Sequence, residues 1–297
     1  MRVFVTGASG FIGSAVVRNL LDAGHQVLGL ARSDASANAL AAIGATAHRG
    51  NLQDLQSLRY GAELSDGVIH TAFIHDFARL EESCEIDRTV IETLGAVVAG
   101  TGRPLVVTSG TGLLADIGLI TEADRTKPGA GHPRVASEEA AAAAVANGAH
   151  VSVMRLPPSV HGVGDHGFVP LLIGLAREKG IAAYVGDGSN RWPAVHRLDA
   201  ANLFRLALEK GDVDARYHGS AEGGVPFREI AEVIGRRLGL PAVSLSPQEA
   251  AGHFGWFAHF AAMDNSSSSD WTRESLGWRP TGPGLIADLD QPAYFEG

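Results

Sequence analysis

The chain has 297 residues with 45% hydrophobic and 19% charged residues, which is typical of a folded globular protein. Its formal net charge of −9 argues against general nucleic-acid binding, which needs a basic face. The one cysteine, Cys84, excludes an internal disulfide and a cysteine-rich metal site, and we predict no bound metal. No apolar stretch approaches the roughly 20 residues of a membrane span, and no basic leader precedes the first apolar run. We therefore expect a cytoplasmic protein with no membrane partner.

The first half of the chain alternates between strand-like and helix-like segments. Short apolar runs predict strands at residues 3–5, 26–30, 45–49, 67–70, 105–108 and 150–155. Ala- and Leu-rich stretches separate them, including a helix over 138–147 that Gly148 closes. This alternation predicts an α/β fold with a doubly wound parallel sheet, a Rossmann fold, over residues 1–160.

The second half is richer in proline and glycine, although helical patterns continue at 171–179, 199–210 and 227–238. We expect residues 161–297 to form a smaller, mainly C-terminal substrate-binding domain. Residues 187–210 are predicted to return to the first domain.

A glycine-rich turn joins the first predicted strand to the first predicted helix. Glycines let a phosphate approach the backbone closely, and the free N–H groups of a helix N-terminus favour an anion. Because this turn lies between a strand and a helix, it predicts a dinucleotide pyrophosphate site. The predicted contacts are Gly7, Ser9, Gly10, Phe11, Ile12 and Gly13.

Arg32 and Ser33 follow the second predicted strand, where a dinucleotide fold holds the adenosine ribose. An arginine there can pair with a 2′-phosphate, so we predict NADP(H) rather than NAD. Asp34 is the opposing signal, and the alternative role of Arg32 is stacking on the adenine.

The Gly-x-x-Gly-x-x-Gly spacing with Phe11 and Ile12 resembles the extended short-chain dehydrogenase/reductase superfamily. Segments 50–52, 66–73, 155–162, 185–188, 192–200 and 276–280 resemble the same family in the same order. The resemblance implies further cofactor contacts from Asn51, Leu52, Thr71, Ala72, Phe73, Pro157, Ser159 and Val160. His70, at the end of a predicted strand, is expected to be structural.

The family's chemistry uses a Ser or Thr after the fifth strand and a Tyr-x-x-x-Lys pair on the next helix. The family's hydroxyl position falls near Gly110, so Ser109 or Thr111 must substitute, and we favour Thr111. The Tyr-x-x-x-Lys pair is missing from this sequence, with Arg134 at the tyrosine position and Glu138 at the lysine position.

Arginine stays protonated and relays no proton, but it can polarise a carbonyl or bind a carboxylate. An i,i+4 salt bridge between Arg134 and Glu138 is the equally favoured alternative. His161 stands where many relatives have a tyrosine and is a candidate replacement acid, with a pocket-wall role as the alternative.

These features predict an NADP-dependent oxidoreductase that acts on a small-molecule carbonyl or alcohol. The missing pair keeps open a non-catalytic NADP(H)-binding sensor or scaffold and, less strongly, a sugar epimerase or dehydratase. The resemblance also implies a possible homodimer through helices around 84–100 and 137–147. The equally favoured alternative is that the Ala-rich helix packs against the sheet.

Overall fold

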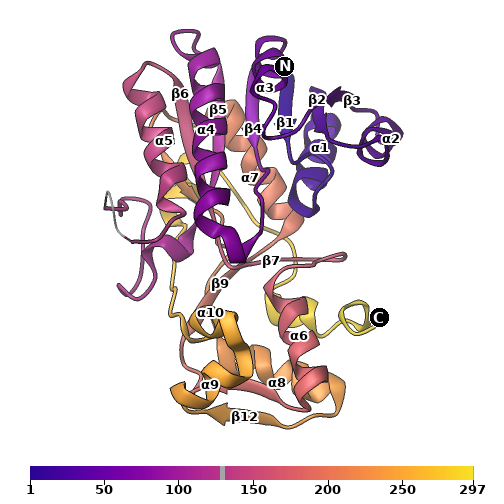
Figure 1. Cartoon of the computed structure of the whole chain (residues 1–297), viewed down its shortest axis with the longest axis vertical. Helices are drawn as coiled ribbons and strands as arrows, with labels where there is room; N and C mark the ends of the chain where they lie inside the picture. Colours follow the sequence, from indigo (N-terminus) through magenta and orange to yellow (C-terminus); the bar gives the residue numbers. More distant parts are fainter. Residues whose placement is uncertain (128–130, 297) are drawn as a thin grey trace.

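A seven-stranded, wholly parallel sheet forms the larger part of the molecule (Figure 1). The computed structural model describes residues 1–127 and 131–296. The strand order is β10-β6-β5-β4-β1-β2-β3, which confirms the predicted doubly wound fold. The strands are β1 (Arg2–Thr6), β2 (Gln26–Ala31), β3 (Thr46–Arg49), β4 (Gly67–His70), β5 (Pro104–Gly110), β6 (His150–Leu156) and β10 (Arg216–His218).

Helices cover both faces of this sheet, because successive side chains of a strand point to opposite faces. Val3 and Val5 belong to the core under α1 (Phe11–Asp22) and α7 (Arg197–Lys210), while Phe4 belongs to the core on the other face. That second face carries α3 (Leu55–Glu63), α4 (Leu80–Val98) and α5 (Val135–Ala146), and α2 (Asp34–Ala42) packs beside β3.

After residue 161 the chain returns to the larger part of the molecule. α7 packs against α1, and β10 pairs with β6 at the edge of the sheet. The return of β10 was not predicted, because Arg216-Tyr217-His218 is too short to show a strand pattern.

The smaller part of the molecule is built around two small sheets and a second hydrophobic core. One sheet holds β7 (Ser159–His161), β9 (Arg191–His196) and β11 (Glu222–Pro226), and the other pairs β8 (Ala182–Val185) with β12 (Ala242–Leu245). Its helices are α6 (Phe168–Lys179), α8 (Phe227–Leu238), α9 (Pro247–Phe254), α10 (Ala258–Ala262) and α12 (Leu285–Leu289). The remaining helix of this half, α11 (Asp270–Leu276), packs against α7 and β10 of the larger part. Short 3-10 turns lie at η1 (Phe77–Arg79), η2 (Thr111–Leu114), η3 (Gly255–Phe257) and η4 (Pro292–Tyr294).

The helices predicted to form a dimer interface pack against each other within the chain. Gly95 of α4 lies against Ala144 of α5, where an added Cβ would come within 2.6 Å of the alanine methyl group. A homodimer through the outer faces of these helices stays a prediction. No helix within the two described ranges is long and apolar enough to cross a bilayer.

Candidate active site

The glycine turn after β1 is a tight cradle that has no room for side chains. Gly7 has φ +68°, and a Cβ there would lie 2.7 Å from the backbone nitrogen of Ala72. A Cβ on Gly13 would collide with the carbonyl group of Gly7. Gly10 is the N-cap of α1, and it offers no side-chain cap for the first N–H groups of the helix. The turn therefore presents backbone donors to an anion.

Residues distant in sequence surround this turn. The Thr71 hydroxyl donates to the Thr6 carbonyl at 2.7 Å, which places the end of β4 beside the turn. The Phe11 ring lies below the guanidinium of Arg197, 4.8 Å from its Cζ, and 5.7 Å from the ring of His166. The smaller part of the molecule therefore reaches the predicted cofactor site.

At the predicted ribose end, Arg32 is exposed at the carboxyl end of β2. The Ser33 hydroxyl is engaged as the N-cap of α2 and accepts from the Ser36 N–H at 3.2 Å. Asp34 forms an ion pair with Arg49 of β3. The negative charge of Asp34, which was the signal against NADP(H), is therefore offset by Arg49.

The remaining predicted cofactor contacts lie in two places. The Asn51 side chain accepts from the Gln53 N–H at 2.8 Å in a local turn, and Leu52 packs against the core. Ser159 on β7 is buried, and its hydroxyl has no hydrogen-bond partner among the described residues. A buried hydroxyl without a partner is costly, so it is suited to a ligand amide. Pro157 is buried, and Val160 packs against the core that lies under α1 and α7.

Arg134, predicted from the sequence to stand at the family's tyrosine position, is held in a network of polar contacts at the start of α5. Its Nη1 lies 2.6 Å from Asp87 Oδ2 and 2.7 Å from the Ser137 hydroxyl, and its Nη2 donates to the Thr108 carbonyl at 3.1 Å. The guanidinium lies 3.8 Å from the centre of the Phe73 ring. Arg134 is therefore a fixed cation beside the predicted path of the cofactor.

Asp87 connects Arg134 to the floor of the glycine turn. His70 Nε2 lies 2.9 Å from Asp87 Oδ1, and His70 Nδ1 lies 2.6 Å from the Thr6 hydroxyl. Burial alone would raise the pKa of Asp87, but Arg134 and His70 outweigh it and lower the pKa to about 2. His70 is thus a buried link in this chain of contacts, from Thr6 to Arg134.

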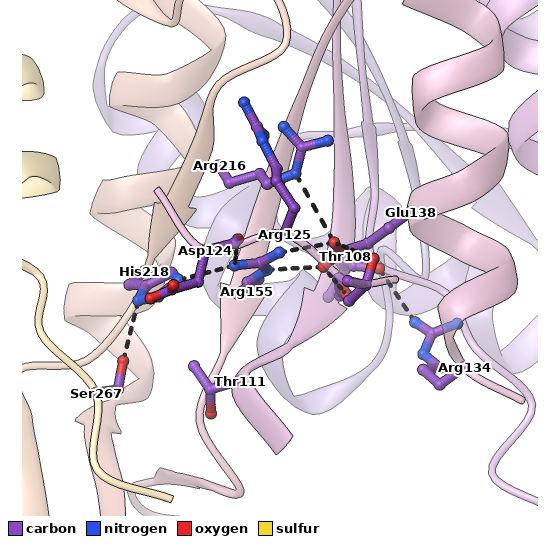
Figure 2. A network of polar contacts seen from close by, with 12 residues as sticks. Thr108, Thr111, Asp124, Arg125, Arg134, Glu138, Arg155, Arg216, His218 and Ser267 are labelled. Carbon is purple, nitrogen blue, oxygen red and sulfur yellow. Dashed lines mark hydrogen bonds and ion pairs between the residues drawn. The ribbon is translucent and has the colours of Figure 1, made fainter. Parts of the chain in front are cut away.

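Glu138, predicted from the sequence to stand at the family's lysine position, belongs to a second network (Figure 2). Arg155 of β6 forms a bidentate ion pair with the Glu138 carboxylate. Its Nε donates to Oε1 at 2.7 Å and its Nη2 donates to Oε2 at 2.8 Å. Burial would raise the pKa of Glu138, but the hydrogen bonds and charge of Arg155 outweigh it and hold the pKa below its usual value. The alternative of an Arg134–Glu138 salt bridge is wrong, because Arg134 pairs with Asp87 of α4 and Glu138 pairs with Arg155 of β6.

The two candidate hydroxyls are both occupied by other side chains. Ser109 donates to Glu138 at 2.9 Å and so belongs to the second network. Thr111 is fully buried and donates to the Asn265 side chain at 2.6 Å, and Figure 2 shows it pointing away from the arginines. Neither hydroxyl contacts Arg134 among the described contacts.

His161 lies in a third place, under the C-terminal segment. Its Nδ1 is 2.8 Å from Asp288, and the same carboxylate accepts from the Tyr294 hydroxyl at 3.2 Å. Burial lowers the pKa of His161, although Asp288 opposes this. The structure therefore brings Arg134 to the predicted cofactor path but keeps Ser109, Thr111 and His161 in separate contacts.

Sequence reasoning missed Asp87. It lies on the apolar face of α4, three residues after Cys84 and four before Ile91, all of them buried. An acidic residue within such a helical stripe signals a buried charge that needs a partner. The partner itself lies too far along the chain to be predicted from spacing.

Comparisons with known proteins place this geometry in a family. Residues 3–218 match the NAD dependent epimerase/dehydratase family. The chain is 50% identical to an uncharacterized protein of Schizosaccharomyces pombe, over 99% of this chain and 100% of that protein. It is 32% identical to a 2-alkyl-3-oxoalkanoate reductase of Stenotrophomonas maltophilia, over 82% of this chain and 77% of that protein. A dTDP-glucose 4,6-dehydratase of Streptomyces venezuelae, solved with NAD bound, shares the fold with TM-score 0.79 at 22% identity, over 99% and 97% of the two chains.

The chain belongs to the NAD-dependent epimerase/dehydratase family, within the extended short-chain dehydrogenase/reductase superfamily, as its glycine spacing predicted. The family is nicotinamide-dinucleotide dependent. The family and the relatives support an enzyme, with oxidoreductase or epimerase/dehydratase chemistry.

Proposed function

We propose that this protein is an NADP-dependent oxidoreductase that interconverts a small carbonyl compound and its alcohol. The observation that carries the proposal is the cradle of Gly7, Gly10 and Gly13 at the uncapped start of α1. At Gly7 and Gly13 an added Cβ would collide with the turn itself or with the segment after β4, so only glycine lets the turn close tightly and leave the uncapped N–H groups of α1 open to an anion.

The residues present fit a dinucleotide along its whole length. The glycine turn would hold the pyrophosphate, Arg32 the ribose 2′-phosphate, and the unpartnered Ser159 hydroxyl the nicotinamide amide. The pairing of Asp34 with Arg49 supports NADP(H), because it offsets the one negative charge next to Arg32.

When bound, NADPH supplies the hydride that reduces a carbonyl carbon. Arg134 would then stabilise negative charge that develops on the carbonyl oxygen, as a preorganised cation needs no reorganisation during the reaction. Its contacts with Asp87, Ser137 and Thr108 fix its place. His75 is a titratable neighbour. Desolvation and then the charge of Arg134 lower its pKa, so its neutral form is favoured and would accept the hydroxyl proton when the alcohol is oxidised.

A second candidate is a protein that binds NADP(H) without catalysis. The Glu138–Arg155 pair favours it, because this buried ion pair occupies the place of the family's lysine. The Arg155 cation there is paired with the Glu138 carboxylate, which offsets the charge that the family's lysine would use to lower the pKa of a neighbouring proton donor. The epimerase or dehydratase alternative is weaker, since those reactions also rely on the missing tyrosine.

The test compares two glycine variants. Gly13→Ala introduces a methyl group that collides with Gly7, whereas Gly174→Ala in α6 adds one in open space. Calorimetric titration with NADPH should show binding to the parent and to Gly174→Ala and its loss in Gly13→Ala. Turnover of a panel of aldehydes and ketones that follows the same pattern supports the oxidoreductase, and binding without any turnover supports the sensor.

A further inference from the structure

Six aromatic side chains form a continuous surface that begins at Arg134 and leads into the smaller part of the molecule. We call it the aromatic wall, and it consists of Phe73, His75, Phe77, Phe168, Trp256 and Phe260. The rings follow one another at 5.1 Å from Phe73 to His75, 6.3 Å from His75 to Phe77 and 4.7 Å from Phe77 to Trp256. Phe260 lies 6.0 Å from Phe77 and 4.9 Å from Phe168.

Three separate segments supply this wall: the chain after β4, the start of α6, and η3 with α10. In Figure 1 the start of α4, just after η1, points toward the part of the molecule that holds α6 and α10. The wall therefore spans the two parts, with its first ring beneath the guanidinium of Arg134.

The core supports the rings of the wall on one side, and the rings keep part of their surface exposed to solvent. Phe257 is fully buried and lies 4.9 Å from Phe168 and 5.6 Å from Phe260, which fixes these two rings against the core. Trp256 is nevertheless 53% exposed, and the four phenylalanines of the wall are half-buried. An exposed tryptophan that continues into partly buried aromatic rings is suited to bind an apolar group.

The charges at the edge of the wall are already neutralised. Arg79 pairs with Asp76 at 2.9 Å and with Glu82 at 3.4 Å. A nucleotide diphosphate needs cations or free N–H groups for its phosphates. The wall instead offers ring faces and edges.

We propose that the aromatic wall binds the body of the substrate, and that the substrate is a flat, apolar and preferably aromatic carbonyl compound rather than a nucleotide sugar. The inference rests on the proposed function, since it places the carbonyl oxygen at Arg134. The rest of the substrate then lies along the side chains of Phe77 and Trp256. Stacking and burial of apolar surface then supply affinity without a charged handle.

The test uses prodan, a naphthyl ketone whose fluorescence shifts to the blue in apolar surroundings. It is titrated into the full chain saturated with NADP⁺, which supplies no hydride. Trp256→Ala should weaken prodan binding about tenfold, while Trp256→Phe, which keeps a ring, should weaken it much less. The matched control is Trp271→Ala, because Trp271 is 42% exposed but stacks on Tyr217 at 5.4 Å, outside the wall.

Two results would overturn the inference. One is equal prodan affinity in Trp256→Ala and Trp271→Ala, with circular dichroism showing both folded. The other is displacement of prodan from the parent by UDP-glucose at lower concentration than by naphthyl alcohols. Failure of the proposed function is seen separately, as absent calorimetric binding of NADPH, and the prodan titration without cofactor still reports on the wall.

Discussion

Asp87 fixes Arg134 from a different helix, with 2.6 Å between Oδ2 and Nη1, and both groups are largely withdrawn from solvent. A buried carboxylate and a guanidinium that face each other are each costly to leave alone. The pair therefore ties α4 to the start of α5 and holds the guanidinium over Phe73. This contact keeps the Arg134 side chain from swinging into solvent.

Asp87→Asn should destabilise the protein by about 3–5 kcal/mol, because it leaves the Arg134 charge without its carboxylate. Urea unfolding followed by circular dichroism measures the free energy of unfolding. The control is Asp76→Asn, which breaks the exposed ion pair with Arg79 and should leave the free energy of unfolding nearly unchanged. A loss in Asp87→Asn no greater than in the control would show that the buried pair contributes little.

Arg134→Lys should lose most of the catalytic effect of Arg134, since an ammonium cannot make the planar contacts to Asp87, Ser137 and Thr108 together. We expect kcat to fall about 10- to 100-fold for Arg134→Ala while the affinity for NADPH stays close to that of the parent. Arg134→Tyr should not restore family chemistry, because Glu138 stands in place of the lysine. Unchanged kcat in Arg134→Ala would reduce Arg134 to a structural ion pair.

Arg32→Ala should remove most of the preference for NADP(H) over NAD(H). A charge-assisted contact with the 2′-phosphate corresponds to ~10- to 100-fold in affinity. Calorimetric dissociation constants for both cofactors, in the parent and the variant, measure the change. The assignment fails if the parent binds both cofactors equally well.

We expect the raised pKa of Asp165 to make the free energy of unfolding depend on pH. Burial raises its pKa to about 6, against hydrogen bonds from Gly167 and Tyr294. Because the folded-state pKa lies above the ordinary value, the folded state favours the protonated acid, and this stabilisation is lost as the pH rises through about 6. Asp165→Asn, which cannot ionise, should therefore raise Tm more at about pH 8 than at about pH 5. An equal change in Tm at both pH values would assign the raised pKa to another group.

The sequence predicts the elements that local patterns specify and misses the contacts between distant segments. The Val3-Phe4-Val5 run and the three glycines carry their structure in a few neighbouring residues, so the fold and the cradle could be predicted. Glu138 and Arg134 looked like natural partners at i,i+4, but each pairs across the fold, with Arg155 and Asp87.

The aromatic wall shows the same limit. Phe77 and Trp256 stack although most of the chain separates them, and nothing in either local sequence indicates the other. Tertiary packing alone brings such rings together, and the same holds for the short strand β10 at the sheet edge.

The most direct test of the oxidoreductase assignment is hydride transfer itself. The protein is incubated with an aromatic ketone and NADPH that carries deuterium at the transferable C4 position, and the product is examined by mass spectrometry. The account predicts an alcohol with deuterium on the former carbonyl carbon, formed by the parent and by Gly174→Ala but not by Gly13→Ala. Tight binding of NADPH by the parent with no labelled alcohol from any ketone or aldehyde in the panel would contradict it and favour the non-catalytic reading.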